Sequence, residues 1–104
     1  MILSSSDAIE GREITETIGL VRGNAARARG IGYDITAGIR NIFGGAVPEY
    51  SRLMTETRDE ATARMVESAE AAGADAVVAV RYTTSMIASG VSEILVFGTA
   101  VKLR

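Results

Sequence analysis

Histidine and cysteine are both absent from the sequence. Without cysteine the chain can form no disulfide and offers no thiol nucleophile, and without histidine it lacks the commonest general base and metal ligand. No serine lies in a recognisable nucleophile motif, and the single lysine, Lys102, is close to the C-terminus. Because the usual acid–base and covalent catalysts are missing, we expect that the protein is not an enzyme.

Strong positive charge and long apolar runs are also missing. The formal net charge is −2 at pH 7, tryptophan is absent, and aromatic residues make up 5% of the chain. Such a chain lacks the basic surface and the stacking platform that nucleic-acid binding requires. No apolar run approaches the roughly 20 residues that span a bilayer, and the start MILSSSD lacks the basic region of a signal peptide. These absences predict a cytoplasmic protein that binds neither nucleic acid nor membranes.

A long helix over residues 48–72 is the clearest feature that is present. Pro48 suits the first turn of a helix, and Gly73 can adopt the left-handed conformation that ends one. One face is charged, with a favourable pair between Glu60 and Arg64. Apolar or small residues recur at steps of three and four along the other face: Tyr50, Leu53, Met54, Thr57, Ala61, Met65, Ala69 and Ala72. Because this stripe is narrow and rich in alanine, we expect the helix to lie close to the sheet that it covers.

Alternating patterns predict the strands of that sheet. Residues 13–25, 76–86 and 92–103 alternate and are rich in β-branched residues, and Ile2–Ser5 are expected to add a short edge strand. Residues 87–90 predict a hairpin turn, with Gly90 free to take positive φ. Gly19 and Gly23 indicate a bulge or a close backbone approach.

Residues 31–43 return to helical spacing and predict a second, shorter helix that Gly44 and Gly45 end. No internal repeat or domain boundary is visible, and 104 residues suffice for one domain with a modest core. The sequence therefore predicts a single α+β domain over residues 1–104. Its long and short helices would lie on one face of an antiparallel sheet.

Both faces of the predicted sheet are apolar. We expect the larger residues to meet the helices: Val78, Val80, Tyr82, Met86, Leu95, Phe97, Val101 and Leu103. The opposite face then carries a second apolar set: Val21, Val77, Ala79, Ile94, Val96 and Ala100. An antiparallel sheet in a monomer normally presents a polar face to water, and no further predicted element covers this one. The sequence therefore predicts a homo-oligomer, in which other copies of the chain cover the second face.

A basic stretch that begins within the first long strand, from Arg22 to Arg29, is the place where we expect a ligand. The candidate ligand-binding residues are Arg22, Asn24, Arg27, Arg29 and Arg81. Residues 30–32, Gly-Ile-Gly, open the shorter helix, and N–H groups at a helix start beside arginines can hold a small anion. The glycine pattern is incomplete, because Ile35 occupies the third position of a GxGxxG motif.

A structural role is the alternative for the same arginines. Those near the shorter helix can pair with a carboxylate of the same or a neighbouring subunit, from Asp34, Glu13 or Glu16. Arg81 lies on a mostly apolar strand, where an ion pair between subunits competes with a ligand contact in the same way. Both interpretations remain open at this point.

Six segments of the chain carry a resemblance to a known family. They are GREI at 11–14, GLVRGN at 19–24, RARGIGYDITAGIRNIFGG at 27–45, PEYSRLMTETRDEA at 48–61, GADAVVAVRYTTSMI at 73–87 and GTAV at 98–101. In this order they resemble the YbjQ family of small, largely uncharacterised bacterial and archaeal proteins. The resemblance implies a β-α-β-β subunit of the dodecin-like kind, assembled as a ring that is expected to be a pentamer. Members of the family often carry a heavy-metal-binding label.

The residues present argue against a metal site. Soft metals need thiolate, imidazole or thioether ligands, and this chain offers only four methionines. Met54 and Met65 lie on the predicted helix stripe and Met86 on the predicted helix-facing side of a strand, where methionine usually fills the core. The carboxylates of the long helix fit a solvated face: Glu56, Asp59, Glu60, Glu67 and Glu70. We therefore expect no metal site and no cofactor.

Taken together, these patterns predict an uncharacterised homo-oligomeric protein that binds a small molecule or ion, or that serves as a structural assembly. Its expected partners are further copies of itself, and a small anion if the arginines bind a ligand. Two alternatives remain. One is a heavy-metal-binding protein, as the family label suggests, and the other is an enzyme acting at a subunit interface.

Overall fold

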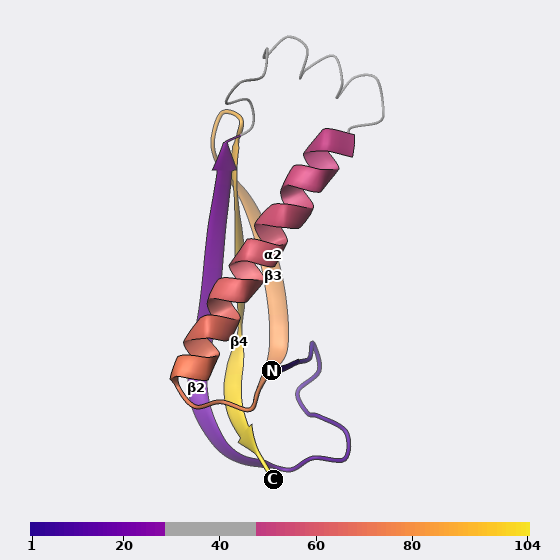
Figure 1. The fold of residues 1–104 in the computed structure, drawn as a ribbon, viewed down its shortest axis with the longest axis vertical. Helices are drawn as coiled ribbons and strands as arrows, with labels where there is room; N and C mark the ends of the chain where they lie inside the picture. Colours follow the sequence, from indigo (N-terminus) through magenta and orange to yellow (C-terminus); the bar gives the residue numbers. More distant parts are fainter. Residues whose placement is uncertain (29–47) are drawn as a thin grey trace.

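The structure, a computed structural model, describes residues 1–28 and 48–104. In this part of the chain the elements are β1 (Ile2–Leu3), β2 (Ile14–Ala28), α2 (Pro48–Ala71), β3 (Ala76–Ala88) and β4 (Val91–Leu103). Figure 1 shows α2 crossing one face of the sheet diagonally. The predicted shorter helix at 31–43 and its end at Gly44 and Gly45 lie outside the described residues. The described residues form an α+β unit, as predicted.

The four strands form one mixed sheet in the order β1-β3-β4-β2. β4 lies between β2 and β3 and pairs antiparallel with both. β1 pairs parallel with β3 through Ile2 and Leu3, so the predicted edge strand is confirmed but the sheet is not wholly antiparallel. β3 and β4 extend further toward each other than predicted and leave residues 89–90 as the turn, where Gly90 has φ 73°.

α2 begins at Pro48, as predicted, and Gly73 follows its last turn with φ 82°. The amide of Gly73 donates to the carbonyl of Glu70, and the amide of Ala74 donates to the carbonyl of Ala69, each over 3.0 Å. These backward hydrogen bonds satisfy carbonyls that the helix itself leaves unpaired. The middle of the predicted stripe is buried: Met54, Thr57, Ala61, Met65 and Ala69.

The main core lies between α2 and the sheet. The sheet contributes mostly small and β-branched residues: Val21, Ala25, Val77, Val80, Ile94, Val96 and Ala100. Gly23 of β2 lies directly beneath the helix. A Cβ at Gly23 would overlap the carbonyl oxygen of Ala61 and lie 2.5 Å from the amide nitrogen of Met65. The close approach predicted from Gly23 and the alanine-rich stripe is therefore confirmed.

The predicted assignment of the faces of β4 is wrong. Ile94, Val96 and Ala100 were expected away from the helix, but they are 0% exposed and belong to the core beneath α2. The expected helix-facing set lies on the opposite side of the strand: Leu95, Phe97, Val101 and Leu103. The physical reason is the short distance between the helix and the sheet. With the helix backbone seated on Gly23, the sheet contributes small and β-branched side chains to the layer beneath the helix, and the larger side chains of β4 lie on its other face.

β3 changes face at a bulge. Between Val78 and Arg81, three steps along β3 match two steps along β4. Ala79, within this stretch, has φ 53°, a conformation that is uncommon for a residue other than glycine. Because of the extra residue, Val77 and Val80 both reach the core beneath α2. The predicted strict alternation, which placed Val77 away from the helix, therefore fails at this bulge.

A second, smaller core covers one end of the opposite face. Its buried residues are Ala76, Val78 and Val101, and Ile9, Ile14 and Leu103 pack against them. The described elements leave the rest of that face, toward the hairpin turn, uncovered. We call this part the open face. Cross-strand pairing places the following residues on it: Leu20, Arg22, Asn24, Ala26, Arg81, Thr83, Ser85, Glu93, Leu95 and Phe97.

Candidate functional site

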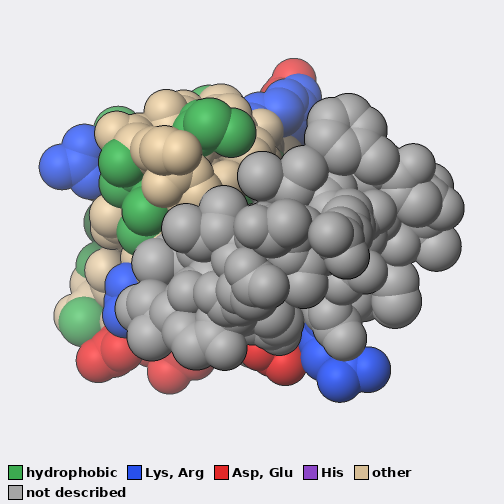
Figure 2. All heavy atoms as spheres, turned by 90° about the horizontal axis from the view of Figure 1, so that it is seen from above, with side chains coloured by type: hydrophobic (Ala, Val, Ile, Leu, Met, Phe, Trp, Pro, Cys, Tyr) green, Lys and Arg blue, Asp and Glu red, His purple; other side chains and the backbone are tan. Residues whose placement is uncertain are grey.

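The open face combines large apolar side chains with arginines. Leu20 is 70% exposed, while Leu95 and Phe97 are half-buried. Arg22 and Arg81 both pair with Phe97, one from each side, so two guanidinium-bearing residues flank an aromatic one at the same level of the sheet. Seen end-on, most of the visible acidic side chains lie along the lower edge of the molecule, and apolar ones show mainly at the left and the top (Figure 2). Apart from Glu93, this face therefore presents apolar and basic side chains, which suit a partner or ligand with apolar and anionic parts.

The structure divides the predicted ligand-binding set. Arg22, Asn24 and Arg81 lie on the open face. Arg27 lies on the opposite side of β2, where it contacts α2. Arg29 is outside the described residues, as are the Gly-Ile-Gly segment at 30–32 and Asp34. The described part of the chain thus brings three of the five residues to one surface.

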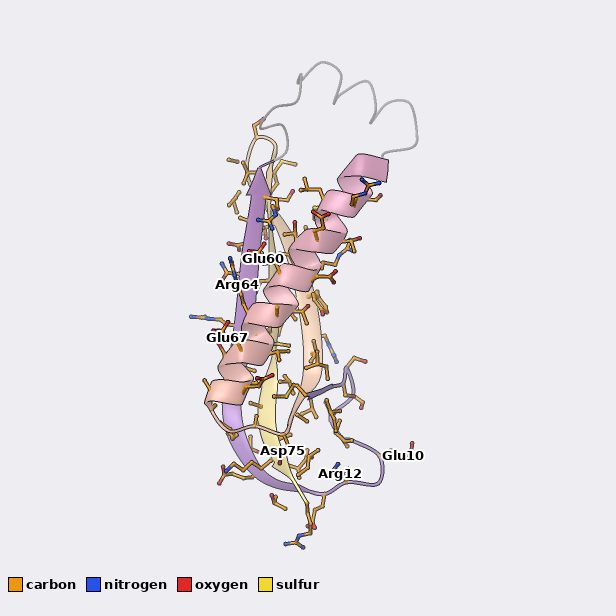
Figure 3. The ribbon with its side chains drawn as sticks, viewed as in Figure 1. Glu10, Arg12, Glu60, Arg64, Glu67 and Asp75 are labelled. Carbon is orange, nitrogen blue, oxygen red and sulfur yellow. The ribbon has the colours of Figure 1, made fainter. Side chains whose placement is uncertain are left out.

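Arg27 has a structural contact. Its guanidinium forms an ion pair with the carboxylate of Glu60 on α2. The other oxygen of Glu60 accepts a hydrogen bond from Arg64 over 2.6 Å, which confirms the predicted pair on the helix. Arg64 also donates to the backbone carbonyl of Asn24 over 2.6 Å. Glu60 and Arg64 point from α2 toward β2 in Figure 3. This network ties the helix to the outer strand, through a carboxylate that the sequence interpretation did not include among the partners of Arg27.

Arg81 also has a structural contact, with the N-terminal segment. Its guanidinium donates to the carbonyl of Ser5 over 2.7 Å and to the carbonyl of Val80 over 2.9 Å. The same segment binds the bulge directly, because the amide of Ala79 donates to the carbonyl of Ser6 over 2.8 Å. The amide of Val80 donates to the carbonyl of Ser4 over 2.9 Å. Arg81 therefore holds the segment that stabilises the strained backbone of the bulge.

Arg22 remains without such a contact. Among the residues that the structure describes, it forms no ion pair and no hydrogen bond, and it is exposed. It lies beside Phe97, whose ring supplies an apolar surface. Of the predicted ligand-binding residues that the structure describes, Arg22 is the one whose charge is available to an anion.

The chain offers few side chains that could bind a heavy metal ion, because it has no histidine and no cysteine. Within residues 1–28 and 48–104, no three acidic residues lie close enough together to hold a metal ion. Met54 and Met65 are buried in the core, and Met86 is 74% exposed, so the prediction that Met86 fills the core is wrong. The exposed thioether of Met86 is therefore in different surroundings from the two buried ones. The residues present do not fit a soft-metal site.

The sequence interpretation also missed the exposed half of β3. All residues from Arg81 to Ala88 are exposed, among them Tyr82, Met86 and Ile87, which are 47%, 74% and 55% exposed. Three consecutive hydroxyl residues, Thr-Thr-Ser at 83–85, interrupt the apolar pattern and could have indicated that this half lies outside the core.

Within the described residues, no helix has the length and apolar character needed to cross a membrane.

Comparison with known proteins places the chain in a family. The YbjQ_1 family model, described as "Putative heavy-metal-binding", matches residues 1–104. A UPF0145 protein of Halorubrum lacusprofundi is 57% identical over 104 residues, which cover 100% of both chains. A UPF0145 protein of Methanosarcina acetivorans is 50% identical over 103 residues, covering 99% of this chain and 97% of the relative.

A solved structure supports the fold. It is the crystal structure of a DUF74-family protein of unknown function from Pediococcus pentosaceus. It matches with a TM-score of 0.69 at 14% identity, over 100% of this chain and 98% of that one. At this identity the likeness concerns the fold alone. Because the family model covers the whole chain and full-length relatives share half or more of its residues, the protein belongs to the YbjQ_1 family.

Proposed function

We propose that the protein is a cytoplasmic homo-oligomeric ring, expected to contain five subunits, that binds a small anionic molecule or serves as a structural assembly. The observation that carries this proposal is the open face. Leu20 is 70% exposed there, next to the strand that bears Leu95 and Phe97. A large apolar area on a sheet face marks a surface that normally packs against another layer. Further copies of the same chain supply that layer without requiring any other partner.

A binding or structural role suits this chain better than catalysis. The sequence has no histidine and no cysteine, and its single lysine, Lys102, lies on β4 at the end away from the open face. Histidine, cysteine and lysine are therefore missing from the open face, and among the described residues Glu93 is its one carboxylate. Apart from the carboxylate of Glu93, its chemistry consists of apolar contact and of hydroxyl, amide and guanidinium groups, which bind a ligand but do not transfer protons near neutral pH.

Arg22 favours a small anion as the ligand. Its guanidinium lies on the open face without a carboxylate partner among the described residues. A guanidinium prefers planar, bidentate contact with a carboxylate or phosphate group. In a ring, one such arginine from each subunit would surround a shared surface and raise the local positive potential. Arg81 is less available, because Ser5 and Val80 already accept its hydrogen bonds.

Light scattering tests the assembly. At micromolar concentration we expect one closed oligomer whose mass does not change on dilution, since stable interfaces bury about 800 Å² per partner. Leu20→Asp should lower the oligomer mass, because it places an unpaired charge on the surface to be buried. Ala63→Asp, on the exposed side of α2, is the matched control and should leave the mass unchanged. A folded wild-type monomer under these conditions would contradict the proposal.

Thermal unfolding tests the anion. We expect inorganic phosphate or a phosphorylated metabolite to raise the melting temperature of the wild type, following RT ln(1 + [L]/Kd). Arg22→Gln should abolish this increase and leave the oligomer mass intact. Arg58→Gln, at an exposed position of α2, removes the same charge elsewhere and should keep the full increase. An equal increase in all three proteins would place the anion away from the open face.

A further inference from the structure

The outer half of β3 has an unpaired edge. β1 pairs with β3 only at Ala76 and Val77, and the N-terminal segment binds β3 no further than Val80 and Arg81. From Tyr82 to Ala88, no described residue pairs with the side of β3 that faces away from β4. Within the described part of the chain, the backbone N–H and C=O groups on that side are therefore unpaired, and such groups are a template for another strand.

The composition of this edge does not protect it from pairing. Natural edge strands are usually blocked by proline, lysine or bulges. Residues 82–88 contain neither proline nor lysine, and a shift in pairing with β4 comes only between Met86 and Ala88. Exposed apolar side chains flank the edge, with Tyr82 at 47% and Met86 at 74%. Such an edge is typical of a strand that pairs with another chain.

The opposite edge of the sheet offers a match. β2 forms that edge along its whole length. Its irregular pairing with β4 is confined to the stretch before Gly19, and the register from Gly19 to Ala28 is continuous. This regular part lies at the same level as the unpaired half of β3, because Ala26 and Ser85 both pair with Glu93. One subunit therefore carries two regular edges of similar length on opposite sides of its sheet.

We propose that the unpaired half of β3 pairs with the regular half of β2 of a second copy of the chain. This inference rests on the proposed homo-oligomer and adds a contact between sheet edges to the proposed burial of the open face. β2 and β3 both run antiparallel to β4, so they run in the same direction and a ring joins them as a parallel pair. The interface is head-to-tail, and in the proposed ring each subunit uses both edges.

The position of α2 supports β2 as the partner edge. α2 packs mainly on β2, and Arg64 reaches the Asn24 carbonyl from above it. A second copy joined through β2 therefore brings its own helix beside the helix-facing side chains of β3, including Tyr82 and Met86. Tyr82 already contacts α2 of its own subunit, with its hydroxyl 2.9 Å from that of Thr62. Pairing between two β3 strands would leave the β2 edge of both copies unused.

Paired cysteine substitutions test the junction without interference, because the chain has no cysteine of its own. In the double variant Ser85→Cys with Ala26→Cys, both substituted positions are exposed and lie on the open face. Within one subunit β4 separates them by two strand spacings, or about 10 Å. A disulfide requires Cα atoms no more than about 6.8 Å apart, so it cannot form within the subunit. The double variant Thr83→Cys with Ala26→Cys tests a second register, in which β3 is shifted by two residues relative to β2 of the neighbouring copy.

After mild oxidation, we expect at least one double variant to give a ladder of covalent multimers in denaturing electrophoresis, ending at the size of the ring. Each single variant should remain monomeric in the same gel, and Ala63→Cys on α2 serves as the exposed control. A covalent dimer from Ser85→Cys or Thr83→Cys alone would overturn the inference in favour of pairing between two β3 strands.

Native mass separates this inference from the proposed function. An intact ring that gives no ladder with either double variant would overturn edge pairing but leave the assembly itself standing. A wild-type protein that is monomeric by light scattering would contradict both proposals.

Discussion

Gly23 of β2 lies directly beneath Ala61 of α2, with no room between them for a side chain. This contact fixes the distance between the helix and the sheet, because backbone meets backbone. It also explains why the core residues of β4 are Ile94, Val96 and Ala100, while Phe97 lies on the other face. The small and β-branched core residues of β4 thus match the close approach of the helix at Gly23 of the neighbouring strand.

Gly23→Ala tests this relationship. The added methyl group would overlap the helix backbone, so we expect α2 to shift and the free energy of unfolding to fall by about 1–3 kcal/mol. Chemical denaturation at one fixed protein concentration measures the change. The control is Asn24→Ala, whose side chain is exposed on the open face. If both variants unfold at the same denaturant concentration, the helix does not rest on Gly23.

Arg81→Gln tests the link between the N-terminal segment and the bulge. The change removes the charged donor to the carbonyls of Ser5 and Val80. Hydrogen bonds of charged groups contribute about 1.5–3 kcal/mol to stability. Because Arg81 is exposed, we expect the free energy of unfolding to fall by less than this. Hydrogen exchange should become faster at the amides of Ala79 and Val80, which donate to the segment. Unchanged exchange at both amides would show that the segment holds its place without Arg81.

Val77→Asp distinguishes the predicted faces from the observed ones. The sequence pattern places Val77 on a surface covered by other subunits, so the change would separate the subunits. In the structure Val77 is 0% exposed and lies in the core beneath α2. We therefore expect the variant to unfold, because a buried carboxylate without a partner costs several kcal/mol. Far-UV circular dichroism measures the outcome, and a folded monomer would favour the original assignment.

The metal prediction concerns zinc, copper and cadmium ions. We expect no tight binding of any of them, because the chain has neither histidine nor cysteine and its described carboxylates form no cluster. Calorimetric titration of protein stripped with a chelator is the measurement. A stoichiometric heat signal at sub-micromolar concentration and neutral pH would reverse the conclusion and identify the carboxylates as ligands.

Local signals in the sequence predicted the elements well. Pro48 and Gly73 mark the two ends of α2 through backbone preferences that act within one turn. Gly19 and Gly23 were expected to mark a bulge or a close approach. Gly19 lies at a shift in pairing with φ 140°, and Gly23 lies beneath the helix. Such features are predictable because each depends on the conformation or size of a single residue.

The candidate site was harder to predict, because it depends on which face each residue occupies. Arg22 and Arg27 are five residues apart and fall on opposite faces of β2, so their nearness in sequence did not make one site. Arg27 pairs with Glu60, a long-range contact that only the packing of α2 on β2 creates. The exposure of Met86 likewise depends on how far α2 covers β3, which no local pattern contains.

The bulge at Ala79 shifts the alternation of side chains between the two faces of β3 by one residue. Even-numbered residues face away from α2 before it, at Ala76 and Val78, and toward α2 after it, at Val80. Gly98 on β4 accommodates the change, since a Cβ there would lie 2.6 Å from Cγ1 of Val77 and 2.9 Å from the carbonyl oxygen of Val78. Deleting Ala79 would remove the bulge and restore a single alternation, and Val80 and Arg81 would keep their present faces, because two steps on β3 would then match two on β4. A gap of one residue opposite Ala79 in a relative would therefore mark a regular β3 with the same surfaces, whereas a β3 of unchanged length that lost the bulge would exchange the two surfaces along the hairpin.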